Sequence, residues 1–117
     1  MEAKYKERLL QVCRVLRELP PGKRFSLQVW HKCGTVACAV GWAATDPWFK
    51  KRGLRLIKDD VLDDYKLPFY DGDEGSLAVK RFFGLDDEED KLFYSCGYTR
   101  RTRKDVIRRI EAFVKDG

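Results

Sequence analysis

Apolar residues recur at helical spacing along the first twenty residues of the chain. The repeat consists of Tyr5, Leu9, Val12, Cys13, Leu16 and Leu19, and Lys6, Arg8, Arg14 and Arg17 fall largely on the opposite side. A period near 3.6 residues, with charges opposite the apolar stripe, predicts an amphipathic helix that packs against a core. Pro20, Pro21 and Gly22 follow at once. Because proline cannot continue a helix, we expect the first helix to end there.

Between residues 25 and 53 the pattern changes twice. Residues 25–30 alternate apolar and polar side chains, which suits a short strand as well as a single helical turn. Residues 36–44 are apolar on every side, so we expect them to form the central buried helix, with Thr35 as its N-cap. Asp46 and Pro47 are a favourable N-cap and first residue for a short helix over residues 48–52, which Gly53 would end.

The second half of the chain predicts one hairpin and further helices. Residues 54–57 and 67–70 are strand-like and would pair across an acidic loop over residues 59–64. Residues 77–83 predict a helix with Gly84 as its C-terminal stop, and Leu85, Leu92 and Phe93 are expected in the core. Asp86 should begin the next helix, because acids favour a helix N-terminus. Thr102 and Asp105 form a capping-box variant that predicts the start of a last helix burying Val106, Ile107, Ile110, Phe113 and Val114.

These elements predict one mainly α domain over residues 1–117. We expect a compact fold of about five helices with at most a small two-stranded β-hairpin. No stretch approaches the roughly 20 apolar residues of a membrane span. The first residues lack the apolar core of a signal peptide, so we expect no membrane association and a cytoplasmic location.

Charge is abundant and unevenly distributed along the 117 residues. Charged residues make up 37% of the chain, and the formal net charge is +5. Residues 1–55 hold twelve Lys and Arg against four acids, residues 56–97 hold five against twelve, and residues 98–117 hold seven against three. A basic total favours a polyanionic partner such as nucleic acid. The alternative is that the acidic middle neutralises the basic ends within the fold.

Four cysteines and one histidine raise the question of metal binding or nucleophilic catalysis. The possible zinc ligands are His31, Cys33, Cys38 and Cys96. Their spacing departs from the paired cysteines of structural zinc sites, so we expect no metal and no cofactor, with Cys13 and Cys38 as small core residues. Cys33 differs because it lies beside Lys32 near a predicted helix start, where a thiolate is stabilised. His31 is poorly placed as its base, so a Cys33-dependent enzyme is only the third hypothesis.

The best candidate for a binding surface is the basic segment that leads into the last helix. Its cations are Arg100, Arg101, Arg103, Lys104, Arg108 and Arg109. Four of them precede or open the helix and two follow on its polar side, so they offer contacts to phosphates, and Tyr94 or Tyr98 offers a ring for base stacking. The alternative is an ordinary solvated helix face. No helix-turn-helix pattern is apparent, which argues against sequence-specific reading of DNA.

A run of five acids is the second candidate surface. It comprises Asp86, Asp87, Glu88, Glu89 and Asp90. Such a run suggests metal binding or mimicry of a nucleic-acid backbone, but a helix start is also where acids are stabilising, and we favour that interpretation. Residues 71–75 resemble a calcium loop only briefly, because Phe82 stands where the bidentate glutamate is needed. We expect a solvated turn there.

The central motif resembles a known family. Residues 33–43 read CGTVACAVGWA, and residues 46–49, 53–54, 82–85 and 92–93 extend the likeness in pieces. The pattern, written CGTxACxxGWA, is similar to that of a family of small uncharacterised proteins of phages and bacteria. The resemblance carries no catalytic residues. It implies that the protein occurs with mobile genetic elements, whose small proteins often bind host or defence proteins.

Taken together, the patterns predict a non-enzymatic binding protein of phage or mobile-element type. We expect it to engage, and to inhibit, a host protein or a protein–nucleic acid complex through the basic or the acidic face, as an anti-CRISPR protein does. The second hypothesis is a nonspecific nucleic-acid-binding protein that uses the basic C-terminal helix. The sequence does not indicate an oligomeric state.

Overall fold

The computed structural model describes residues 2–25, 31–32, 36–61, 65–87, 89–93 and 102–116. Its helices are α1 (Ala3–Arg17), α2 (Ala39–Ala43), α3 (Pro47–Lys50), α4 (Gly75–Phe83), the 3-10 helix η1 (Glu89–Phe93) and α5 (Arg103–Asp116). The strands are β1 (Arg24–Phe25), β2 (His31–Lys32), β3 (Val36–Ala37), β4 (Arg55–Lys58), β5 (Lys66–Tyr70) and β6 (Asp73–Glu74). The five α-helices of the described part of the chain confirm a mainly helical fold, with a radius of gyration of 13.2 Å.

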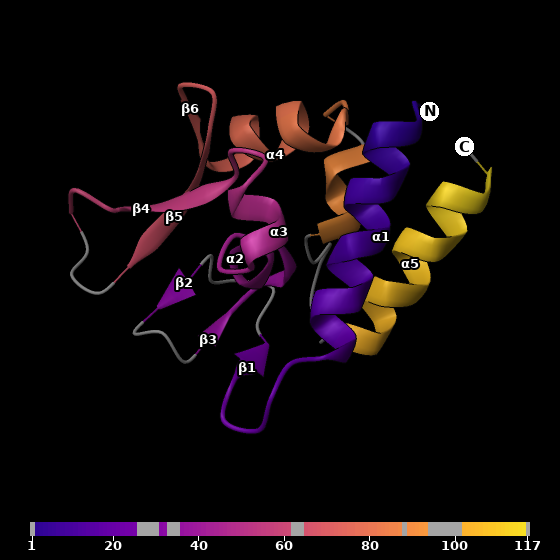
Figure 1. Cartoon of the computed structure of the whole chain (residues 1–117), viewed down its shortest axis with the longest axis horizontal. Coiled ribbons are helices and arrows are strands. Elements are labelled where there is room, and N and C mark those ends of the chain that lie inside the picture. Colours follow the sequence, from indigo (N-terminus) through magenta and orange to yellow (C-terminus); the bar gives the residue numbers. More distant parts are fainter. Residues whose placement is uncertain are drawn as a thin grey trace.

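The two longest helices, α1 and α5, pack side by side along one side of the molecule (Figure 1). Helix α1 buries Leu9, Val12, Cys13 and Leu16 completely, as its apolar stripe predicted. Helix α5 buries Val106, Ile107 and Ile110 against it, and Phe113 and Val114 are partly buried. An exposed ion pair between Arg17 and Glu111, 2.8 Å long, joins the two helices. The core therefore lies between this pair and the short elements that cover its other side.

The structure contains more β-structure than one hairpin. The predicted pairing of β4 with β5 is present and antiparallel, but β6 adds a third strand beyond a tight turn in which Asp71 has φ 51° and Gly72 φ 86°. A second three-stranded sheet has the order β1-β3-β2, with β1 parallel to β3. The expectation of at most a two-stranded hairpin was therefore wrong. Strands of two residues are too short to show a period-2 pattern, so β2, β3 and β6 were not predictable, and β1 overlaps the segment from residue 25 only at Phe25.

The central apolar segment is shorter as a helix than predicted. Val36 and Ala37 form β3, Cys38 occupies the N-cap position, and only Ala39–Ala43 are helical. An apolar run fits a buried strand as well as a buried helix, and here the partner strands β1 and β2 decide between them. The predicted cap Thr35 lies outside the described residues. Burial was predicted correctly, because every residue of α2 is buried.

The predicted starts of α3 and α5 and the predicted end of α4 are confirmed, whereas α3 ends at Lys50, two residues before its predicted end. The Asp46 carboxylate accepts a hydrogen bond from the backbone N–H of Trp48 at 3.0 Å, with Pro47 as the first helical residue. Gly84 ends α4 with φ 65°, a left-handed conformation that favours glycine. In α5, Thr102 and Asp105 exchange hydrogen bonds of 2.9 and 3.3 Å between backbone N–H groups and side-chain oxygens.

The helix predicted to begin at Asp86 is only a five-residue 3-10 turn, η1. Asp86 and Glu89 still form reciprocal hydrogen bonds, at 2.8 and 3.1 Å, between the backbone N–H of one and the carboxylate of the other. This is a capping-box arrangement, although the 3-10 helix itself begins at Glu89, three residues after the predicted start. Leu85, Leu92 and Phe93 are buried, as predicted.

Gly84 is expected to be the glycine least tolerant of substitution. A Cβ at this position would lie 2.6 Å from Cδ2 of the Tyr5 ring, in addition to the strain of a positive φ. We expect Gly84→Ala to lower the free energy of unfolding by about 1–2 kcal/mol from backbone strain, and by more if Tyr5 does not move. Urea unfolding measures this. Gly22→Ala is the matched control, because Gly22 also has a positive φ but open space around it; equal losses in both variants would contradict the steric argument.

Candidate functional site

Of the four described cations of the predicted basic C-terminal face, Arg103, Arg108 and Arg109 have partners within the fold. Arg103 turns toward α1, where its Nη1 donates to the backbone carbonyls of Leu16 at 3.3 Å and Leu19 at 3.5 Å. A cation at the C-terminal end of a helix satisfies carbonyls that have no partner within the helix and opposes the helix dipole. Arg103 therefore has a structural role that the sequence did not reveal.

The other cations of that segment differ in whether they have a partner within the fold. Arg108 pairs with Asp105 at 2.9 Å, and Arg109 is half-buried and has an interaction partner. Lys104 is exposed, and in the described part of the chain it forms no ion pair. Arg100 and Arg101 lie outside the described residues, as do the candidate stacking rings Tyr94 and Tyr98. The described part of α5 thus offers a weaker anion surface than its sequence suggested.

The acidic candidate surface is also tied to local structure. Asp86 and Glu89 cap η1, and Asp87 accepts a hydrogen bond from Lys80 at 2.5 Å, which lowers the pKa of Asp87. Glu88 lies outside the described residues, and Asp90 is placed in η1 by its backbone alone. Of the described acids, Asp86 and Glu89 therefore cap the start of η1, and Asp87 pairs with α4.

The turn predicted over residues 71–75 is shorter in the structure, because Asp73 and Glu74 form β6 and Gly75 begins α4. Asp71 and Gly72 join β5 to β6, and Arg81 of α4 contacts Asp71 at 2.7 Å and Asp73 more closely. These hydrogen bonds raise the pKa of Arg81, and the one that Arg81 donates to Asp73 contributes most. The carboxylates are thus neutralised by an arginine of the same chain.

The cysteine hypothesis is tested only in part. Cys13 and Cys38 are free and buried, as predicted, and burial raises the pKa of each thiol to about 11. A protonated, enclosed thiol is a poor nucleophile. Cys33 and Cys96 lie outside the described residues, and His31 is placed in β2 by its backbone alone. The absence of a zinc site and the reactivity of Cys33 therefore stay predictions.

These two thiols are expected to make stability fall at high pH. An unfolded chain ionises its cysteines near the ordinary pKa of 9, whereas the folded protein holds them neutral up to about pH 11. The unfolded state then binds fewer protons, so the free energy of unfolding decreases as pH rises above about 9, by up to about 1.4 kcal/mol per thiol and pH unit. Urea unfolding at pH 8 and pH 10 measures this. A Cys13→Ala/Cys38→Ala variant should show a smaller decrease, and an equal one would contradict the assignment.

A different group of cations remains available to a partner. We call it the α3–β4–β5 cationic surface; its members are Lys50, Lys51, Arg52, Arg55, Lys58 and Lys66, and strand alternation places Arg55 on one face of the hairpin and Lys58 with Lys66 on the other. All six are exposed, and in the described part of the chain none forms an ion pair with a carboxylate. Lys58 and Lys66 are cross-strand partners in the hairpin, so two like charges face each other. Such a pair is destabilising, which makes it more easily explained by binding than by folding.

Two arginines of this surface lie on aromatic rings. The Arg52 guanidinium lies 3.5 Å from the centroid of the Trp48 ring and donates to the Trp48 carbonyl at 2.9 Å. Arg55 lies over Phe69, its cross-strand partner, at 4.9 Å. Cation–π contacts hold both guanidinium groups in place.

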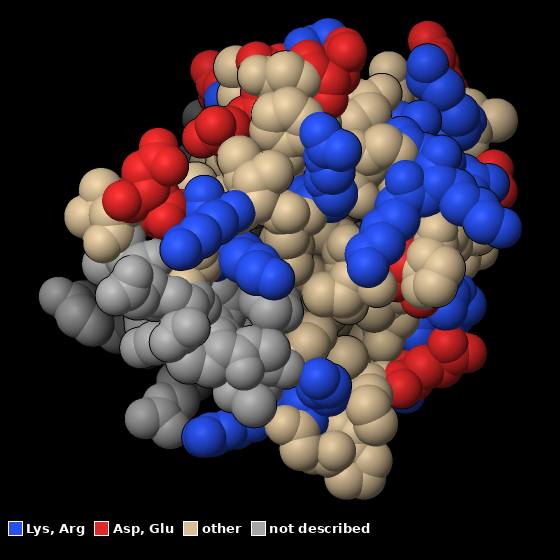
Figure 2. All heavy atoms as spheres, turned by 60° about the vertical axis from the view of Figure 1, so that its left-hand side comes forward, with Lys and Arg blue, Asp and Glu red and all other residues tan. Residues whose placement is uncertain are grey.

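Figure 2 shows the side of the molecule on which the β4–β5 hairpin lies. Lys and Arg side chains are spread across this face, and carboxylates gather mainly along its upper and left edges. The acids nearest to the surface in sequence are Asp59 and Asp60, which follow Lys58 at the hairpin tip. The cationic surface therefore ends at that tip.

No family model, no curated protein and no solved structure matches the chain. The resemblance of its central motif to a phage and bacterial family thus stays an expectation, and the functional argument depends on the geometry. Among the described residues, no helix is both long and apolar enough to span a membrane.

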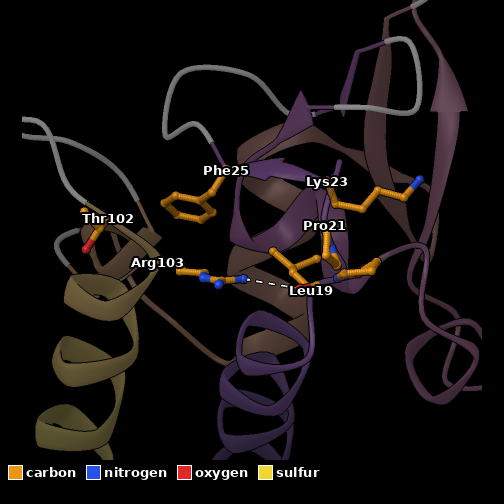
Figure 3. A pocket seen from close by; sticks show the side chains of 7 residues that line it. Leu19, Pro21, Lys23, Phe25, Thr102 and Arg103 are labelled. Carbon is orange, nitrogen blue, oxygen red and sulfur yellow. Dashed lines mark hydrogen bonds between the residues drawn. The ribbon is translucent and has the colours of Figure 1, made fainter.

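A pocket is present away from the hairpin, between the C-terminal end of α1, β1 and the N-terminal end of α5. We call it the α1–α5 pocket; Figure 3 shows it from close by. Its volume is about 510 Å³, and its described lining is Leu19, Pro20, Pro21, Lys23, Phe25, Thr102 and Arg103. Sequence reasoning missed it, because its walls come from segments about 80 residues apart. Most of its surface is apolar, with a few polar groups, which is typical of small-molecule sites.

Proposed function

We propose that the protein is a non-enzymatic binding protein that binds nucleic acid through the α3–β4–β5 cationic surface. The nucleic acid is either free or part of a protein–nucleic acid complex. The observation that carries the proposal is the set of six exposed cations without a carboxylate partner in the described part of the chain. Each cation that reaches a phosphate releases a condensed counterion, which gives affinity without sequence selectivity.

The arginines on rings support a nucleic acid over other polyanions. Arg52 and Arg55 are held by Trp48 and Phe69, so little side-chain entropy is lost when they bind. A guanidinium group held in this way donates hydrogen bonds to a phosphate from its edge, or stacks on a base through its open face. Lys50, Lys51 and Lys58 have flexible stems and supply charge that adapts to the path of a backbone.

The geometry favours this surface over both faces expected from the sequence. In the described part of the chain, Nη1 of Arg103 and the guanidinium of Arg108 already have partners within the fold, and so do Asp86, Asp87 and Glu89. Inhibition of a host complex, of the anti-CRISPR kind, is compatible with the proposal if the chain binds the nucleic acid of that complex. In that case binding alone, without catalysis, suffices for inhibition.

The salt dependence of binding tests the proposal. Fluorescence anisotropy with labelled single-stranded and duplex DNA and RNA, at several salt concentrations, gives the observed binding constant. For a duplex we expect log K to fall linearly with log salt, with a slope of about −0.9 for each phosphate contacted. Six available cations set an upper limit of about −5 on that slope.

Two results would contradict the proposal. One is the absence of saturable binding to any of the four nucleic acids at low salt. The other is binding with a slope near zero, which would show that phosphate contacts do not carry the affinity. A preference for single strands would favour stacking on Arg52 and Arg55, whereas equal affinity would favour backbone contacts alone.

A further inference from the structure

We propose that the α1–α5 pocket binds a nucleoside phosphate, with the phosphate at Arg103 and the base against Phe25. The ligand is either a free mononucleotide or the terminal nucleotide of a strand. The proposal does not depend on the cationic surface, because the pocket lies between other elements. Its volume of about 510 Å³ falls within the range of pockets that enclose small organic ligands.

The orientation of Arg103 is the first argument. Its Nη1 donates to the carbonyls of Leu16 and Leu19, which fixes the guanidinium at the pocket wall. In the described part of the chain its Nε and Nη2 donate to no partner. Two donors of a fixed, planar fork match two oxygens of a phosphate or carboxylate. The helix contacts thus orient the group that a ligand needs.

The wall around Arg103 fits a planar ring. Figure 3 shows the Phe25 ring and the Arg103 guanidinium extending toward the same space. Leu19, Pro20 and Pro21 provide the apolar remainder of the wall. Phe25 is half-buried, which leaves part of its ring accessible. A base stacks on such a ring with little dependence on its identity.

The charge of the pocket favours phosphate over carboxylate. Lys23 and Arg103 are its charged groups, and its described lining contains no acid. A phosphate monoester carries about −1.5 to −2 charges at pH 7, so it matches two cations better than a carboxylate does. Lys23 lines the pocket, but its ammonium lies 5.4 Å from the Trp42 ring, and Figure 3 shows it directed away from Phe25 and Arg103, so it reaches a ligand only after its flexible side chain changes conformation.

The N-terminal end of α5 adds to this preference. Thr102 lines the pocket just before the first residue of this 14-residue helix. The positive end of the helix dipole therefore faces the region where the phosphate would lie. The Asp105 carboxylate is nearby but is held by the Thr102 N–H and hydroxyl and by Arg108.

NMR titration of the full chain tests the proposal. Adenosine 5′-monophosphate, adenosine and inorganic phosphate are each added to ¹⁵N-labelled protein. We expect saturable shifts of the amides of Leu19, Lys23, Phe25, Thr102 and Arg103 with the nucleotide, and at least about tenfold weaker binding of the two fragments, since each retains only part of the contacts. Arg103→Gln and Lys23→Gln should each weaken nucleotide binding, the former by about tenfold. Lys104→Gln, outside the pocket on the same helix, should leave it unchanged.

The outcomes separate this proposal from the previous one. The pocket assignment would be overturned if the nucleotide and inorganic phosphate bound equally well. It would also be overturned if neither Lys23→Gln nor Arg103→Gln changed the shifts. Lys23 forms no helix cap, so the Lys23→Gln variant can still be measured if Arg103→Gln unfolds. A Lys50→Glu/Lys51→Glu/Lys58→Glu variant should bind the mononucleotide normally. Oligonucleotides with and without a 5′-phosphate distinguish the two sources, because only a strand end seated in the pocket gains affinity from that phosphate.

Discussion

Reversing three charges of the α3–β4–β5 cationic surface is expected to abolish most nucleic-acid binding. The variant Lys50→Glu/Lys51→Glu/Lys58→Glu removes three potential phosphate contacts and adds three repulsive charges. The loss of three contacts alone lowers affinity on the order of 100-fold near physiological salt. All three side chains are exposed and form no ion pair in the described part of the chain, so the fold should remain intact. Anisotropy measures the affinity, and circular dichroism checks the fold.

A matched variant on α5 separates local from overall charge. Lys104→Glu/Arg108→Glu/Lys115→Glu makes the same change, so both variants have a formal net charge of −1 instead of +5. If the cationic surface is the binding site, the α5 variant should lose far less affinity. A larger loss in the α5 variant would move the site to the C-terminal face. Equal losses would show that only net charge matters, and the surface assignment would be wrong.

The largest expected effect on stability is that of Phe82→Ala. Phe82 is fully buried, and its ring lies 4.9 Å from Phe83, 5.1 Å from Tyr70 and 5.8 Å from Phe49. The Arg8 guanidinium lies 4.2 Å from the same ring and donates to the Phe82 carbonyl at 2.7 Å. Removing a phenyl ring from such a site costs about 3–5 kcal/mol through lost burial and the cavity that remains.

That loss is a large part of the 5–15 kcal/mol that typically stabilises a domain. Urea unfolding should show a lower midpoint with little change in slope. Leu77→Ala provides the control on the same helix, because Leu77 is 51% exposed and its truncation should change stability by only about 0.5 kcal/mol. A loss below 1 kcal/mol for Phe82→Ala would mean that Phe82 is not the centre of the aromatic core.

The helix boundaries show what local chemistry determines. The Asp46 carboxylate and the Thr102–Asp105 pair form hydrogen bonds that cap the starts of helices, and Gly84 ends a helix. Each of these contacts is made between residues that are close in the sequence. Such signals act within a few residues and are therefore readable in the sequence. The apolar stripe of α1 is predictable for the same reason, since its period depends on helix geometry alone.

The strand at Val36 and Ala37 could not be predicted from the sequence. The apolar run has no periodicity that separates a strand from a helix. The hydrogen bonds that decide between them come from β1, whose residues lie twelve positions earlier in the chain than their partners in β3. The two short sheets depend on pairings of this kind.

The same distinction governs the candidate sites. The sequence determined the number of charges and their basic–acidic–basic order, because both are properties of composition. It did not determine which cations are used internally: Arg103 meets the carbonyl of Leu16, 87 residues away, while Lys50, Lys51 and Arg55 meet no acid in the described part of the chain. Whether a charge is neutralised depends on distance in space, which only the tertiary structure sets. The sequence alone thus established a basic, mainly helical protein, and the packing of α1 against α5 and of α3 beside the β4–β5 hairpin decided where it can bind.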